Sequence, residues 1–244
     1  MITTGIASRQ GTRPLNADSA TIHRLPGTPM TAAALVDGIG NTHAVVNFAR
    51  TAAEVIARVG ARRGPLLGIL AAAEMSTAPP GVQVEDGVAV AAVASESGTT
   101  TIAWTGDSRI YGWTGSALVQ RSTDQTMGTW LRRWGGTAVT LHTDDEPDRT
   151  VPTEQAARVL DDMARAALSR CSIATVPLLM IDDPLVILTS DGMHGQISPE
   201  TLEDLVRQHA GGDPQALANA LVAAATGDDS GYRDDATAVV IRRH

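Results

Sequence analysis

The feature that most constrains this fold is a set of four short segments that place an aspartate at one end of an apolar run. Short apolar runs bounded by turn residues are typical of buried strands. If such strands lie side by side in sheets, three or four carboxylates would meet at one edge. The aspartates and their runs are Asp37 after residues 32–36, Asp107 after 101–104, Asp191 after 185–189 and Asp234 before 238–241.

Converging carboxylates of this kind predict a metal site. Several negative charges at close range are stable only when cations neutralise them. Oxygen ligands without an accompanying set of Cys or His side chains favour Mg²⁺ or Mn²⁺ over zinc, so the sequence predicts a metal-dependent hydrolase. Taken singly, an aspartate beside a glycine is as readily a turn residue; it is the ordered set that favours metal binding. The acids at 144–146 and 228–229 are better explained as solvated loops.

Composition excludes several classes of protein. The 244 residues carry a net charge of −8 and no basic stripe, which argues against a nucleic-acid partner. Cys171 is the only cysteine, which excludes an internal disulfide and suits a reducing cytosol. No signal-peptide pattern and no apolar run of bilayer length is visible, so we expect a cytoplasmic protein without membrane contact. Without a linker-like segment, residues 1–244 are expected to form a single domain.

The order of the predicted elements indicates an α+β fold. Strands are expected near residues 3–7, 19–23 and 31–36 and again over 87–119. Helices are expected over 45–59, from Pro65 to about 75, over 153–168, and after two cap-and-proline pairs, at 198–199 and 213–214. Blocks of strands followed by blocks of helices suit two packed antiparallel sheets covered by helices.

The order of the motifs resembles that of the metal-dependent protein serine/threonine phosphatases of the 2C (PPM) type, and in particular of the bacterial members that consist of a single domain. The segments that carry the resemblance span nearly the whole chain. They are Arg-Pro-Leu-Asn-Ala-Asp at 13–18, Asp-Gly-Ile-Gly at 37–40, Gly-Asp-Ser-Arg at 106–109, Ser-Asp-Gly at 190–192 and Asp-Asp-Ala-Thr at 234–237, with a weaker match at 122–136. No single motif is specific, but five in this order make coincidence unlikely. The resemblance implies a four-layer α-β-β-α sandwich.

The resemblance also implies which residues bind metal. Asp37 would bridge two ions, Mn²⁺ or Mg²⁺, with the carbonyl of Gly38 on one ion and Asp191 and Asp234 on the other. Asp107, which we expect in a hairpin turn, would share a third and weaker ion with Asp191. A water activated between the two ions would attack the phosphate directly, without a covalent intermediate.

Further roles follow for residues around the metals. Arg13 matches the phosphate-binding arginine of the family, and its guanidinium fork suits two phosphate oxygens. Asp18 would orient a metal-bound water. Arg109 is expected to make structural hydrogen bonds around its turn. The family's histidine after Asp-Gly is missing here, and His43 and His194 are better explained as ordinary histidines.

The predicted activity is hydrolysis of phosphoserine and phosphothreonine in proteins, opposing a Ser/Thr protein kinase. The alternative is a catalytically weak pseudophosphatase that binds phosphoproteins or a regulatory partner; a phosphatase of small phosphoesters is a third possibility. Intact Asp37, Asp191 and Asp234 favour the active enzyme. Ala17 and Asp235 depart from the family pattern, and the alanine predicts a loosely held second metal.

Overall fold

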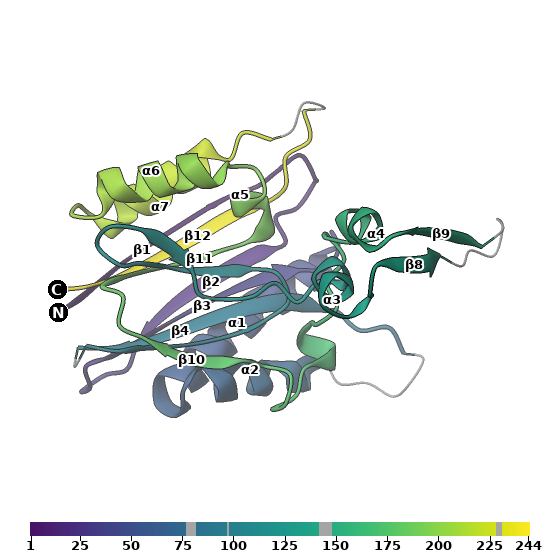
Figure 1. The fold of residues 1–244 in the computed structure, drawn as a ribbon. Coiled ribbons are helices and arrows are strands. Elements are labelled where there is room, and N and C mark those ends of the chain that lie inside the picture. Colours follow the sequence, from purple (N-terminus) through teal and green to yellow (C-terminus); the bar gives the residue numbers. More distant parts are fainter. Residues whose placement is uncertain (77–81, 97, 142–147, 228–230) are drawn as a thin grey trace.

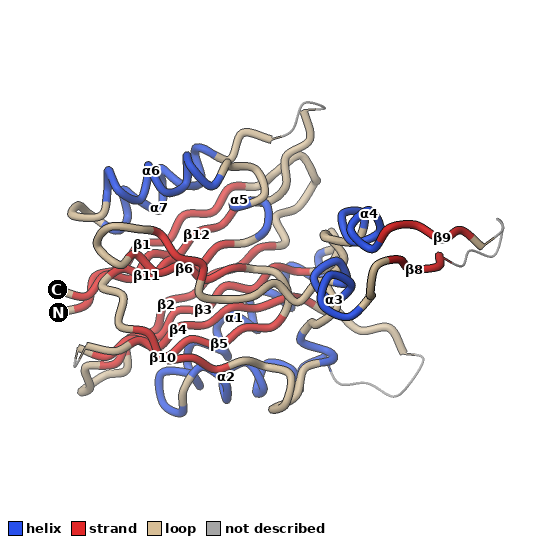
Figure 2. The backbone as a smooth tube through the Cα atoms, viewed as in Figure 1, coloured by secondary structure: helices blue, strands red, loops and turns tan. Residues whose placement is uncertain are grey.

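The computed structural model describes residues 1–76, 82–96, 98–141, 148–227 and 231–244. Its centre is a pair of antiparallel sheets that pack face to face (Figures 1 and 2). The first sheet has the order β1 (Ile2–Arg9), β12 (Ala236–Arg243), β11 (Leu185–Thr189), β6 (Arg109–Trp113) and β7 (Leu118–Gln120). The second has the order β10 (Leu178–Ile181), β5 (Thr100–Thr105), β4 (Gly87–Ser95), β3 (Met30–Gly38) and β2 (Asp18–Arg24).

Helices cover the outer faces of both sheets. Figure 1 shows α6 and α7 above the first sheet and α1 and α2 below the second. The predicted four-layer α-β-β-α sandwich is therefore confirmed. The helices are α1 (His43–Arg63), α2 (Pro65–Ala73), α3 (Met127–Trp134), α4 (Thr153–Val159), α5 (Asp191–His194), α6 (Pro199–His209) and α7 (Pro214–Ala224), with short 3₁₀ turns η1 (Glu74–Ser76) and η2 (Leu168–Arg170).

The apolar strands are buried on both faces, which explains why they read as continuous apolar runs. In β11, Val186 and Leu188 pack between the sheets, while Leu185 and Ile187 face α6 and α7. Successive side chains of a strand point to opposite faces, so this division follows from the pleat. The small side chains of β3 and β4 leave room for α1 and α2 to lie against the second sheet.

Two helices begin where the sequence places a cap followed by a proline. The Ser198 side chain accepts a hydrogen bond from the Thr201 backbone at the start of α6. Asp213 does the same for Gln215 at the start of α7. In each case a proline occupies the first turn, where its missing N–H costs nothing.

A smaller unit lies at one end of the sandwich, formed by α3, α4 and the ribbon of β8 (Ala138–Leu141) with β9 (Arg149–Pro152). The helix predicted over 153–168 begins at Thr153 as expected but is shorter: α4 ends at Val159 and a loop follows. The loop is held because the backbone N–H groups of Met127 and Gly128 donate to the carbonyls of Met163 and Leu160. Tertiary hydrogen bonds thus replace the helical ones.

None of the helices in the described ranges combines the length and the apolarity that crossing a bilayer requires.

Candidate metal and phosphate site

The ends of strands from both sheets bring the predicted acids together. Asp18 begins β2 and pairs directly with Asp37, near the end of β3. Asp191 begins α5, two residues after the end of β11. Asp234 lies two residues before β12, the neighbour of β11 in the same sheet. One end of the sandwich therefore carries acids from both sheets.

Asp107 reaches the same end by a different route from the one expected. The prediction of a hairpin turn is wrong, because β5 belongs to the second sheet and β6 to the first. Residues 106–108 are the crossover between the sheets. Gly106 has a φ of 96°, and a Cβ there would overlap the side chain of Val88. This glycine lets the chain turn closely around β4 and delivers Asp107 to the acids.

The serine of the Ser-Asp-Gly motif ties the two sheets together at the site. Ser190 is fully buried, and its hydroxyl donates to Asp18 Oδ2 at 2.7 Å. The Ser190 hydroxyl oxygen also accepts a hydrogen bond of 3.0 Å from the backbone N–H of Thr237. Ser190 thereby connects the start of β2, the end of β11 and the start of β12.

The glycine of the same motif explains the approach of Asp191 to Asp234. A Cβ added at Gly192 would lie 2.8 Å from the Cβ of Asp234 and would overlap the carbonyl oxygen of Asp235. Only glycine permits this packing. Gly38 is similarly confined, since a Cβ there would lie 2.9 Å from the carbonyl oxygen of Ala17.

Burial and mutual repulsion make this group of acids hold protons unusually tightly. Burial is the main cause that raises the pKa of Asp37 well above the usual range, followed by the charges of Asp191 and Asp18. Burial also raises the pKa of Asp18 well above the usual range, although hydrogen bonds from Ser190 and Thr237 oppose it. The pKa of Asp107 rises to about 7 through burial and the charge of Asp191.

Asp191 lies at the centre of the cluster. Burial raises its pKa, a hydrogen bond with Asp37 opposes this, and the charge of Asp234 adds to it. Carboxylates that repel one another in a shielded place are stabilised by a divalent cation, and their oxygens are the ligands that Mg²⁺ and Mn²⁺ prefer. The donor set therefore fits the metals that the sequence predicts.

The acidic side chains lie near one another but are not arranged to coordinate an ion. In the part of the chain that the structure describes, no three His, Cys, Asp or Glu side chains are arranged to hold a metal as they stand. Asp234 is engaged by Arg13, whose Nη2 donates to Asp234 Oδ1. Binding an ion would require Asp234 to turn from the guanidinium toward the other acids.

Arg13, which the sequence predicts to bind phosphate, lies beside Asp234. Its partial burial disfavours the charge, but the nearby carboxylates, Asp234 foremost, outweigh this and raise its pKa. In the described chain its Nε is buried without a hydrogen-bond partner. A buried donor without an acceptor is costly, so this N–H is available for an anion.

Asp235 has a role that the sequence did not reveal. It is 2% exposed and accepts hydrogen bonds from the backbone N–H groups of Gly11, at 2.8 Å, and Ala17, at 2.9 Å. This carboxylate fastens the loop that carries Arg13 to the start of β12. Its position beside Asp234 was visible in the sequence, but its distant partners were not.

Ala17 is buried, and a Cβ on Gly38 would lie 3.4 Å from the Ala17 Cβ. A longer side chain at position 17 would have to make room in packed surroundings. The weak second metal that this alanine predicts remains a prediction.

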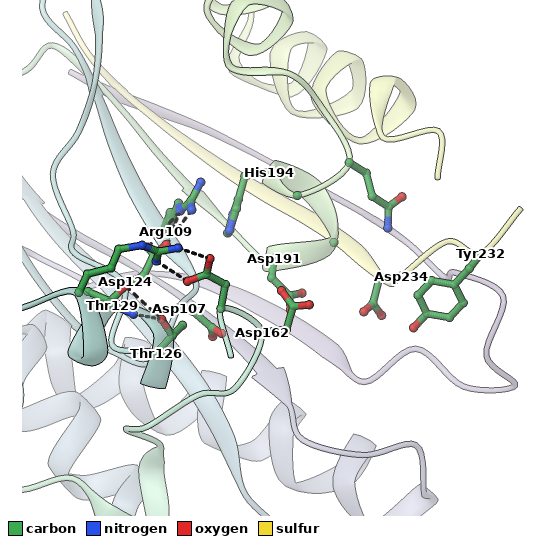
Figure 3. Close-up of a pocket in the computed structure, with 15 residues that line it drawn as sticks. Asp107, Arg109, Asp124, Thr126, Thr129, Asp162, Asp191, His194, Tyr232 and Asp234 are labelled. Carbon is green, nitrogen blue, oxygen red and sulfur yellow. Dashed lines mark hydrogen bonds and ion pairs between the residues drawn. The ribbon is translucent and has the colours of Figure 1, made fainter. Parts of the chain in front are cut away.

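A pocket of about 810 Å³ opens beside the acids (Figure 3). Asp107, Asp191 and Asp234 line it, and the Tyr232 ring lies next to Asp234. Arg109 also lines it and is paired with Asp124, with Nη2 at 2.7 Å from Oδ2. This contact confirms the structural role expected for Arg109.

The two histidines occupy different positions. His194 lines the pocket, and its Nδ1 lies 2.9 Å from the hydroxyl of Thr189. Burial, and then the charge of Arg109, lowers the pKa of His194 well below its usual range. His43 is exposed at the first residue of α1.

The acids at 144–146 and 228–229, which the sequence places in solvated loops, lie outside the described residues.

The sequence matches no protein-family model and no curated protein sequence. Solved structures do resemble the fold over the whole chain. The Streptococcus agalactiae serine/threonine phosphatase is 14% identical, with a TM-score of 0.79 and 100% of both chains covered. The Mycobacterium tuberculosis serine/threonine phosphatase PstP/Ppp is 21% identical, with a TM-score of 0.71, covering 100% of this chain and 99% of that one.

A third structure is the PPM Ser-Thr phosphatase MsPP from Mycobacterium smegmatis, in complex with cacodylate. It is 23% identical, with a TM-score of 0.71, and the alignment covers 99% of this chain and 98% of that one. Identities this low establish the fold. The protein has the fold of the bacterial PPM-type serine/threonine phosphatases, as the order of its sequence motifs implied.

Proposed function

We propose that the protein is a metal-dependent phosphatase that removes phosphate from phosphoserine and phosphothreonine in proteins. The observation that carries this proposal is the gathering of Asp18, Asp37, Asp107, Asp191 and Asp234 at one end of the sandwich. In addition to burial, the charge of Asp191 raises the pKa of Asp18, Asp37 and Asp107, and the charge of Asp234 raises the pKa of Asp191. Such a cluster is unfavourable for the fold alone, so a function that requires it is the better explanation. The fold shared with bacterial serine/threonine phosphatases supports the reaction class.

Two Mg²⁺ or Mn²⁺ ions, when bound, would supply Lewis-acid chemistry and a nucleophile near neutral pH. Asp37, the Gly38 carbonyl, Asp191 and Asp234 would hold them, and Asp107 would contribute to a third, weaker site. Asp18, fixed by the Ser190 hydroxyl, would accept a hydrogen bond from a coordinated water and orient it.

Arg13 would bind the phosphate group of the substrate. In the structure, Asp234 accepts a hydrogen bond from Arg13. If Asp234 held a cation, the guanidinium would lose that acceptor, and its Nε and Nη2 would be available to two phosphate oxygens. Metal binding and phosphate binding would then be coupled through this one ion pair.

The pocket of about 810 Å³ beside the acids has room for a phosphorylated side chain, and we propose phosphoproteins of a Ser/Thr kinase pathway as substrates. A cytoplasmic location accords with the single cysteine, Cys171, which cannot form an internal disulfide.

The test is phosphate release from an aryl phosphate and from a phosphothreonine peptide, with Mn²⁺ or Mg²⁺ and with a chelator. Asp37→Ala and Asp191→Ala should each lower kcat by ~10³ or more, equivalent to about 4 kcal/mol of transition-state stabilisation. Asp204→Ala, an exposed position on α6, is the matched control and should keep full activity. Metal-independent turnover, or normal turnover in the folded Asp37 and Asp191 variants, would refute the metal-dependent mechanism, whereas no phosphate release with either metal would favour the binding module.

A further inference from the structure

A second cavity of about 400 Å³ lies beside the acidic pocket. The two share Asp124, Thr126 and Thr129, which form a ridge between them. Beyond the ridge the lining changes from acidic to aromatic and basic. We call this cavity the tryptophan groove; the residues that define it are Trp104, Trp130, Arg133, Trp134, Arg165 and Pro177.

Two tryptophans of the groove are exposed in a chain that has few aromatic residues. Trp130 is 38% exposed and Trp134 is 65% exposed. Both lie on α3, a helix of eight residues. Tryptophan is normally well buried, so two exposed rings on one short helix mark a surface for interaction.

An arginine lies over each of these rings. The guanidinium carbon of Arg133 is 5.3 Å from the centre of the Trp134 ring, and that of Arg165 is 5.5 Å from the centre of the Trp130 ring. Among the described residues, neither arginine has a carboxylate within 4 Å. Arg132 of the same helix differs, since it pairs with both Glu154 and Asp161.

The groove therefore offers two positive charges that no acid of the described chain neutralises. Asp124, the carboxylate on the ridge, is already paired with Arg109. In a chain with a net charge of −8, such a local excess of positive charge would attract an acidic ligand that the rest of the surface repels.

The helix that carries the groove is held firmly. The Thr126 side chain caps α3 by accepting a hydrogen bond of 3.1 Å from the Thr129 backbone. Gly128 packs so closely on α4 that a Cβ would overlap the carbonyl oxygen of Ala157. Leu131 is buried against residues of α4 and β9. The two rings are therefore presented by a fixed scaffold.

We propose that the tryptophan groove binds an acidic segment of the phosphoprotein substrate, next to the phosphorylated residue. This inference rests on the proposed function, because it assumes that the phosphorylated residue enters the acidic pocket. The peptide would cross the ridge at Thr129, place acidic side chains against Arg133 and Arg165, and pack its backbone and apolar groups on the two rings.

The experiment compares two peptides with the same phosphothreonine, one with glutamates and one with lysines in the flanking positions. The unmodified protein should prefer the glutamate peptide by about 10-fold in kcat/KM, mainly through KM, since two exposed charge pairs provide that much. Arg133→Glu/Arg165→Glu should reverse the preference and leave hydrolysis of an aryl phosphate unchanged. Arg50→Glu/Arg58→Glu makes the same change of charge on the exposed face of α1 and should leave the preference unaltered.

The inference would be overturned if the unmodified protein and the Arg133→Glu/Arg165→Glu variant had the same ratio of kcat/KM for the two peptides. It would also be overturned if the unmodified protein preferred the lysine peptide. If circular dichroism shows that this variant is unfolded, Arg133→Gln/Arg165→Gln replaces it and should abolish the preference. Absence of aryl phosphate hydrolysis would instead count against the proposed function. In that event, the groove is tested by tryptophan fluorescence with the unphosphorylated glutamate peptide, and an unchanged spectrum would overturn the inference.

Discussion

Replacing Asp107 with asparagine should stabilise the metal-free protein while impairing its metal-dependent activity. The pKa of Asp107 rises from an ordinary value of 3.8 to about 7, so its charge is disfavoured in the folded state. For an acid with a raised pKa there is no penalty below the unfolded value. The penalty grows as the pH rises from about 4 to about 7, because the unfolded chain loses its proton first, and it is then constant.

The magnitude follows from the size of the shift. About three pKa units at roughly 1.4 kcal/mol per unit give an upper bound of about 4 kcal/mol at pH 8. Asp107 is partly exposed, and solvent screening reduces this bound. We therefore expect Asp107→Asn to raise the free energy of unfolding by about 2 kcal/mol at pH 8 and by less than about 1 kcal/mol at pH 5.

The assay is urea unfolding at both pH values, with a chelator and with Mn²⁺. Bound cations should remove the penalty in the unmodified protein, so the advantage of the variant should shrink when Mn²⁺ is added. Asp204→Asn, exposed on α6, serves as the control and should change stability by less than about 0.5 kcal/mol at either pH. A gain of the same size at pH 5 and pH 8, or a loss at pH 8, would show that the folded protein does not disfavour the charge of Asp107.

Three other substitutions test the site. Asp235→Ala leaves the N–H groups of Gly11 and Ala17 without their acceptor and should lower the free energy of unfolding by about 2 to 4 kcal/mol in urea; a change below about 0.5 kcal/mol would contradict the anchoring role. Gly192→Ala should separate Asp191 from Asp234 and raise the Mn²⁺ concentration for half-maximal activity, and superimposed Mn²⁺ titrations would count against this. Arg13→Lys should not restore the kcat/KM that Arg13→Ala loses on phosphopeptides, because a point charge cannot bind two oxygens; full activity in the lysine variant would exclude forked binding.

Much of the fold could be predicted because local signals and the tertiary structure agree. The apolar runs at 32–36 and 185–189 are strands, and the cap-and-proline pairs start α6 and α7 where the sequence places them. The helix predicted over 153–168 is too long, because the carbonyls of Leu160 and Met163 accept hydrogen bonds from the start of α3 in place of helical ones. No local pattern carries that information.

The sequence by itself determined which residues could form the site, because aspartates beside glycines at strand ends are a local feature. It could not determine how those strands combine. Three features link segments far apart in the chain. They are the crossover that puts Asp107 between the sheets, the Ser190 hydroxyl that joins the sheets, and the hydrogen bonds from the backbone of Gly11 and Ala17 to Asp235. Likewise, the tryptophan groove exists only because α3 packs beside residue 165, since burial and charge are shared between neighbours in space rather than in sequence.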